Sequence, residues 1–133
     1  MTTQPSTART SAAVPVVEKF IEAYNSGDVA AILEVTAPDL TVEHHNRGVK
    51  VDSAQAFADL LASFAGAFPD KHFENRRALH VVDDNTVLVE QTWVATAIAD
   101  VPGWAQTGET VRLDVCTRFT VHEGVVTEYH DYG

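Results

Sequence analysis

The sequence predicts an α+β fold in which helices pack on one face of an antiparallel sheet. Two observations predict it: apolar residues recur at helical spacing in the first half of the chain, and β-branched and aromatic residues dominate from Phe73 onward. The chain has 133 residues, of which 45% are hydrophobic, and this length suits one domain. We expect residues 1–12 to be a disordered leader and residues 13–133 to form that single domain.

Three helices are expected in the first half. The first carries one apolar stripe, with Ser11 as a plausible N-cap, and ends at the sequence NSGD of residues 25–28. Asp28 can cap a short second helix over residues 29–35, which ends before Pro38. Asp52 or Ser53 can cap the third, which ends at Pro69. The two long stripes are Val14, Val17, Phe20, Ile21 and Tyr24, and then Phe57, Leu60, Leu61, Phe64 and Phe68.

Strands are expected in between and afterwards. A short strand is predicted over residues 39–45, and longer ones over residues 73–82, 86–98, 111–121 and 125–132. The polar sequences at residues 83–85 and 122–124 are typical of hairpin turns, and the Pro- and Gly-containing residues 100–108 of a loop. Helices followed by a meander of strands favour the α+β class.

Charge and cysteine content exclude several functions. Nineteen Asp and Glu against nine Lys and Arg give a formal charge of −10, which disfavours binding to nucleic acid or to an anionic membrane. The single Cys116 excludes an internal disulfide and a thiolate zinc cage. No apolar run approaches the roughly 20 residues of a membrane helix, and the first residues lack the apolar segment of a secretory signal. We therefore expect a cytoplasmic protein.

Several local sequences resemble one family. They are IEAYNSGD at residues 21–28, AFPD at 67–70, TGETV at 107–111 and GVVTEYHDY at 124–132. With the order of elements, they resemble the SnoaL-like polyketide cyclases of the nuclear transport factor 2-like superfamily, over nearly the whole chain after Ala13. The resemblance implies a curved sheet that wraps around a long helix as a cone, with a small-molecule ligand in its open mouth. It also implies a homodimer that pairs through the outer sheet face.

Strand alternation then predicts the residues that line the cone. In the last strand Asp131 shares a face with Tyr129, Thr127 and Val125, and this less charged face is assigned inward. Thr117 faces inward on the preceding strand, with Val115 and Phe119. The resemblance places Gln91 and Trp93 inside, and His44 inward on the first strand. His130 is expected on the opposite face from Asp131. A mostly apolar cavity with a few polar points is typical of a small-molecule site.

Asp131 is the candidate catalytic acid and base. In the SnoaL-like cyclases and in limonene epoxide hydrolases, an aspartate at this place in the last strand has that role. A carboxylate that faces an apolar cavity loses hydration, which favours its protonated form and suits it to take and return a proton near neutral pH. The alternative is a solvated carboxylate near the end of the chain.

His44 is the second catalytic candidate, as a base or a hydrogen-bond donor; the alternative is a structural histidine at a strand end. Substrate-binding candidates are Gln91, Trp93, Thr117, Tyr129 and Tyr24: the aromatic rings could stack on a flat polyketide-like ligand or only fill the core. His44 and His45 are not expected to form a metal pair, because adjacent strand residues point to opposite faces. Neither metal nor cofactor is expected.

The sequence departs from other superfamily members. Gln91 and Trp93 stand where the epoxide hydrolases carry an Arg and an Asp on the middle strand. Phe20, His44 and Val115 stand where the steroid isomerases carry a Tyr on the first helix and two acids. The cyclase histidine of the penultimate strand is replaced by Thr117. The aspartate at position 131 survives all three comparisons, which favours a cofactor-free cyclase. A non-catalytic small-molecule-binding module, or an isomerase, hydrolase or dehydratase of the same superfamily, is the alternative.

Overall fold

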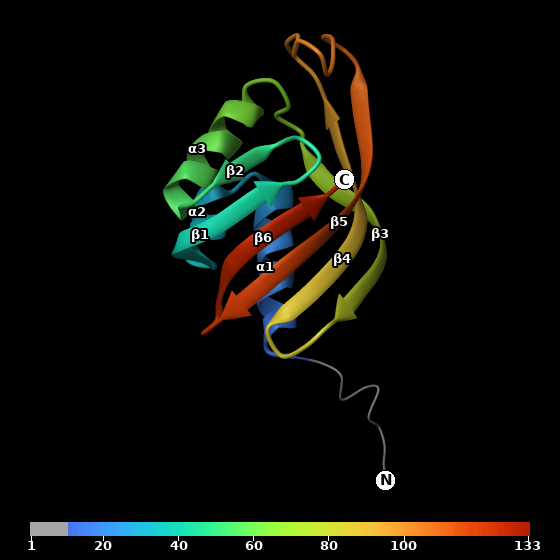
Figure 1. The fold of residues 1–133 in the computed structure, drawn as a ribbon. Helices are drawn as coiled ribbons and strands as arrows, with labels where there is room; N and C mark the ends of the chain where they lie inside the picture. Colours follow the sequence, from blue (N-terminus) through green and yellow to red (C-terminus); the bar gives the residue numbers. More distant parts are fainter. Residues whose placement is uncertain (1–10) are drawn as a thin grey trace.

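The computed structural model describes residues 11–133, which form three helices and one six-stranded sheet (Figure 1). The α+β prediction is confirmed. Of the expected leader, residues 1–10 lie outside the described residues. None of the described helices combines the length and the apolar content that a membrane crossing requires. The elements are α1 (Ala13–Ser26), α2 (Val29–Glu34), β1 (Thr36–His44), β2 (Val49–Val51), α3 (Ala54–Ala65), β3 (His72–Val81), β4 (Thr86–Thr96), β5 (Thr110–His122) and β6 (Val125–Tyr132).

The helix boundaries follow the expected caps, with one exception. Asp28 accepts a hydrogen bond from the Ala31 N–H, and Ser53 caps α3 in the same way. Gly27 ends α1 in the left-handed conformation, with φ 71°. The prediction of Ser11 as the first N-cap is wrong: Ala12 holds that position, and the Ser11 hydroxyl accepts from the N–H of Ala13, two residues further on.

The sheet has the strand order β2-β1-β6-β5-β4-β3. Every neighbouring pair is antiparallel except β1 and β6, which run parallel. The expectation of a purely antiparallel sheet is therefore wrong at this pair. The last strand returns to lie beside the first, and no local signal marks a pairing across so much sequence. The three-residue strand β2, which pairs with β1, was not predicted either.

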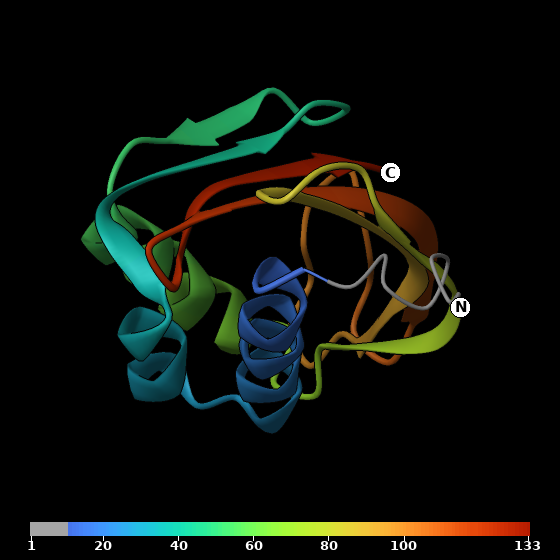
Figure 2. The same ribbon diagram turned by 90° about the horizontal axis from the view of Figure 1, so that it is seen from below.

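The sheet curves around α1 without closing (Figure 2). Its register is interrupted in β1, in β3 and between β5 and β6. In β3 the interruption includes Asn75, whose φ is 53°. Bulges of this kind bend a strand and increase its twist. The resulting concave face encloses the core and, at one end, leaves room for a cavity.

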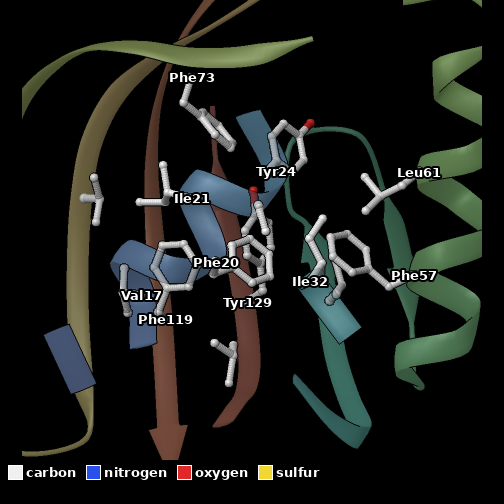
Figure 3. Packing of buried hydrophobic residues seen from close by; sticks show 14 of the residues in the cluster. Val17, Phe20, Ile21, Tyr24, Ile32, Phe57, Leu61, Phe73, Phe119 and Tyr129 are labelled. Atoms are coloured by element: carbon white, nitrogen blue, oxygen red, sulfur yellow. The ribbon is translucent and has the colours of Figure 1, made fainter. Parts of the chain in front are cut away.

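Aromatic residues from α1, α3 and the two C-terminal strands form the centre of the core (Figure 3). The Phe20 ring lies 5.3 Å from Phe119, 5.4 Å from Tyr129 and 6.1 Å from Phe57, measured between centroids. All four side chains are buried. This cluster joins the helices to β5 and β6, so the inner face of β6 is held rigidly beside the cavity.

Candidate functional site

A cavity of about 90 Å³ lies between α1, α3 and the concave face of the sheet. Aromatic and aliphatic side chains make up most of its wall. Five of the seven predicted site residues line it: Asp131, His44, Trp93, Tyr129 and Tyr24. Gln91 and Thr117 do not belong to the lining; they are buried on the same concave face of β4 and β5. An apolar pocket with a few polar side chains is the usual form of a small-molecule site.

His44 and Asp131 form a pair inside this cavity. They lie opposite each other in the parallel register of β1 and β6, and His44 Nδ1 is 3.2 Å from Asp131 Oδ2. The His44 side chain is 23% exposed and the Asp131 side chain 14%. A carboxylate oxygen can only accept, so Nδ1 carries the proton in this contact. The sequence placed both residues inward but did not predict that they pair.

Three polar atoms on β4, β5 and β6 are buried without a hydrogen-bond partner among the described residues. They are Asp131 Oδ1, Thr117 Oγ1 and Gln91 Nε2. Thr117 lies directly opposite Asp131 in the register of β5 and β6. The Thr117 hydroxyl also lies near the Tyr129 hydroxyl, but the two do not have the geometry of a hydrogen bond. Each unsatisfied buried group costs about 1–3 kcal/mol, and such groups concentrate where a ligand or water binds.

Two tyrosines present hydroxyl groups near the acid. Trp93 Nε1 donates to the Tyr24 hydroxyl at 2.8 Å, a contact between two side chains that are each 6% exposed. Burial raises the pKa of Tyr24, and the Trp93 bond opposes this in part. Burial, and then the negative charge of Asp131, raise the pKa of Tyr129 well above its ordinary value. Both phenols therefore stay protonated at neutral pH and can donate hydrogen bonds.

The mouth of the cavity includes residues that the sequence analysis missed. Trp104, from the loop between β4 and β5, stacks on Trp93 with centroids 5.7 Å apart. Arg47, from the turn between β1 and β2, lies 4.8 Å above the Trp104 ring. Asn46 in that turn donates to the Gly133 carbonyl at 2.6 Å. Only Trp104 could have been found from the sequence: it is a large apolar residue in a loop of turn-forming residues, where solvent exposure is expected, and such a residue indicates a binding surface.

The alternation predicted for β6 holds at its C-terminal end only. Tyr129 and Asp131 face the cavity, and His130 faces the other side of the sheet, as expected. His130 is nevertheless buried, because His45 and Tyr132 pack around it. At the start of the strand the prediction is wrong: Val126 is in the core, whereas Val125 and Thr127 are only partly buried. The bulge between β5 and β6 shifts the alternation by one residue.

The charged residues of the outer face pair within the chain. Arg112 reaches Glu74 at 3.1 Å, Arg77 reaches Asp114 at 3.6 Å and Arg118 reaches Glu128 at 3.9 Å. The resemblance described in the sequence analysis implies a homodimer that pairs through this face. The homodimer stays a prediction, and these ion pairs leave fewer free charges for it.

The profile of the SnoaL-like domain family matches residues 17–129. The chain belongs to this family. The match begins within α1 and ends within β6, two residues before Asp131.

Solved structures with the same fold carry different functional names. A candidate polyketide cyclase from Xanthomonas campestris is 23% identical, with a TM-score of 0.82 over 92% of this chain and 90% of its own. AclR, a candidate hydroxylase from Streptomyces galilaeus, is 23% identical, with a TM-score of 0.72 over 89% and 72%. An LEH-like epoxide hydrolase from M. tuberculosis is 24% identical, with a TM-score of 0.70 over 91% and 81%. A comparison with curated proteins found no match. These similarities establish the fold, and the reaction must be argued from the site.

Proposed function

We propose that this protein is a small-molecule enzyme that uses acid–base catalysis of the polyketide-cyclase type, with Asp131 as the acid and base. One observation carries the proposal. Asp131 Oδ2 contacts His44, while Oδ1 is buried beside an apolar cavity and has no partner among the described residues. A carboxylate at the cavity wall with one oxygen free of hydrogen bonds can take a proton from a substrate carbon, once a rotation of the side chain turns that oxygen toward the cavity.

The reaction would be an internal aldol addition. Asp131 Oδ1 takes a proton from a carbon between two carbonyl groups, and the resulting enolate attacks a third carbonyl of the same molecule. A carbon–carbon bond forms, and the new alkoxide takes the proton back from Asp131. The substrate supplies its own acidity because the enolate is delocalised over two carbonyls. The cavity supplies proximity, which accounts for much of the rate gain in ring closure.

Neighbouring side chains have supporting roles in this proposal. His44 donates from Nδ1 to Asp131 and so fixes the orientation of the carboxylate. Tyr24 accepts from Trp93, which leaves its own O–H free to donate to a substrate oxygen at the cavity wall. Thr117 and Gln91 do not line the cavity, so a buried water, and not the substrate, would satisfy their unpaired polar atoms.

The cavity indicates a small, flat substrate. Its volume of about 90 Å³ is well below the roughly 300–1,000 Å³ of pockets for drug-sized ligands. The ring faces of Trp93, Trp104 and Tyr129 favour an unsaturated or aromatic molecule. A molecule with a single ring, or a chain just long enough to close into one, fits this space better than a fused polycycle.

The direct test is proton exchange at carbon. Ethyl 2-methylacetoacetate, which has one acidic carbon between two carbonyls, would be incubated with the protein in D₂O and followed by ¹H NMR. We expect exchange faster than in buffer alone, and a loss of about 10²–10⁴-fold in the catalysed rate with Asp131→Asn. Asp39→Asn, at an exposed position of β1, is the matched control and should keep the full rate. Undiminished exchange by Asp131→Asn would dispose of the mechanism.

A second candidate is a binding module that uses the same cavity without chemistry. It is favoured by Thr117, which stands where the cyclases carry a histidine, and by the mostly apolar wall. Quenching of tryptophan fluorescence reports binding, because Trp93 and Trp104 line the cavity. Binding of the ester without exchange above the buffer rate in the wild-type protein would support this candidate instead.

A further inference from the structure

We propose that the outer face of the sheet carries a binding site for a divalent transition-metal cation of the zinc type. Its ligands are Glu43, His45 and His130, each of which offers one ligand atom, and these atoms all lie within 4.8 Å of one another. The site lies on the opposite side of the sheet from His44 and Asp131. It does not depend on the proposed catalysis.

The parallel pairing of β1 and β6 brings these ligands together. Glu43 lies opposite His130 in the register, and the next pair along is His44 with Asp131. Successive residues point to opposite faces, so one pair enters the cavity and the other faces outward. His45 follows directly after β1 and is held there by its N–H, which donates to the Asp131 carbonyl at 3.0 Å. Figure 1 shows β1 and β6 side by side, with the same direction.

The distances are close to those of a zinc site. His45 Nε2 lies 2.9 Å from His130 Nδ1, and Glu43 Oε1 lies 4.0 Å from the same nitrogen. Zinc–nitrogen bonds of about 2.0–2.1 Å in a tetrahedron put neighbouring ligand atoms roughly 3.3 Å apart. The first of these distances must therefore lengthen and the second shorten, each by less than about 1 Å, and the third, between Glu43 and His45, is within 4.8 Å and exceeds the tetrahedral value by at most about 1.5 Å. Small rotations of two side chains at the surface would accomplish this.

Neighbouring side chains hold both histidines in an orientation that suits metal binding. Glu128 Oε1 lies 3.0 Å from His130 Nε2, so this nitrogen donates and the Nδ1 lone pair is left to face His45. A carboxylate behind a histidine is the usual outer shell of a metal ligand, because it fixes the tautomer and the ring orientation. The Tyr132 ring stacks on His45 with centroids 4.4 Å apart and an angle of 6°. Both rings are thus oriented before a cation arrives.

The donor set selects the kind of metal. Two imidazole nitrogens and one carboxylate oxygen suit zinc, cobalt or nickel, whereas magnesium and calcium prefer oxygen ligands throughout. Three protein ligands leave one position for water. Without metal, His45 Nε2 carries the proton that bridges it to His130 Nδ1. Metal binding must displace this proton, which moves to His45 Nδ1 or is released to solvent. A bound cation would also join the ends of β1 and β6 and thereby stabilise the fold.

Adjacent histidines provide the matched test. Zinc chloride would be titrated into the untagged protein at neutral pH by calorimetry, together with His45→Gln and His44→Gln. We expect one equivalent of zinc to bind the wild-type protein, and a zinc-dependent rise in melting temperature. His45→Gln should lose both effects, while His44→Gln, which changes the neighbouring residue on the cavity face, should keep both. Glu128→Gln should weaken zinc binding by about 10–100-fold.

Two further variants exclude other zinc ligands. His80→Gln removes an exposed histidine that contacts Glu90 at 2.9 Å, and Cys116→Ser removes the thiol; both should bind zinc like the wild-type protein. His45 is exposed, so its replacement should preserve the fold, which far-UV circular dichroism would verify. The proposal is overturned if the wild-type protein binds no zinc, if His45→Gln binds it equally well, or if His44→Gln or Cys116→Ser abolishes binding.

Discussion

The hydrogen bond between Trp93 and Tyr24 should be measurable as an interaction energy. Tyr24→Phe removes one oxygen and leaves the indole N–H of Trp93 without the acceptor that lies 2.8 Å away. Because both side chains are only 6% exposed, water cannot replace that acceptor, and we expect a loss of about 1–3 kcal/mol in the free energy of unfolding. Trp93→Phe removes the donor and also part of a ring, so its total cost mixes two effects.

A double-mutant cycle separates these effects. The double variant lacks both partners and leaves no unpaired group, so it should be less unstable than the sum of the two single variants by about 1 kcal/mol. Urea unfolding followed by far-UV circular dichroism is the suitable assay, because tryptophan fluorescence changes with Trp93 itself. Tyr132→Phe, at a tyrosine that is 44% exposed, is the control and should change stability by less than about 0.5 kcal/mol. Additivity of the two single variants within about 0.3 kcal/mol would refute the argument.

Three smaller effects on stability can be tested by the same unfolding assay. Arg76 holds the pKa of Glu18 below its ordinary value of 4.5, through a two-pronged contact at 2.7 and 2.8 Å. Because the pKa of Glu18 is lower in the folded state, Glu18→Gln should lower the free energy of unfolding by up to about 1 kcal/mol at neutral pH. The difference in stability between the variant and the wild-type protein should vanish as the pH falls below 4.5, and a difference that persists in acid would contradict this. Ser53→Ala removes the cap that accepts from the Ala56 N–H and should cost about 1 kcal/mol, whereas no loss would mean that water caps α3 equally well. Gly124→Ala should cost about 1–2 kcal/mol, because Gly124 has a φ of 80° in the turn before β6; a neutral result would show that the turn rearranges.

The sequence by itself predicted the three helices, five of the six strands and the inward side of Asp131 and Tyr129. Ser53 and Asp28 were recognisable as caps, because a cap bonds to a backbone group only three residues away. Alternation showed that Asp131 shares a face with Tyr129 and opposes His130, and the family resemblance implied the inner face for Trp93. Such signals act within a few residues, so they can be read without knowing what lies across the sheet.

Only the tertiary structure decided which of these residues meet. His44 and Asp131 are 87 residues apart, and their contact depends on the parallel register of β1 and β6. The same register creates the cluster of Glu43, His45 and His130, which the sequence analysis did not predict because it weighed only the neighbours His44 and His45 as metal ligands. The bulge that moves Val126 into the core is likewise a property of the β5–β6 pairing. Strand pairing joins distant segments through backbone hydrogen bonds that every residue type can make, and for this reason the side chains alone do not encode it locally.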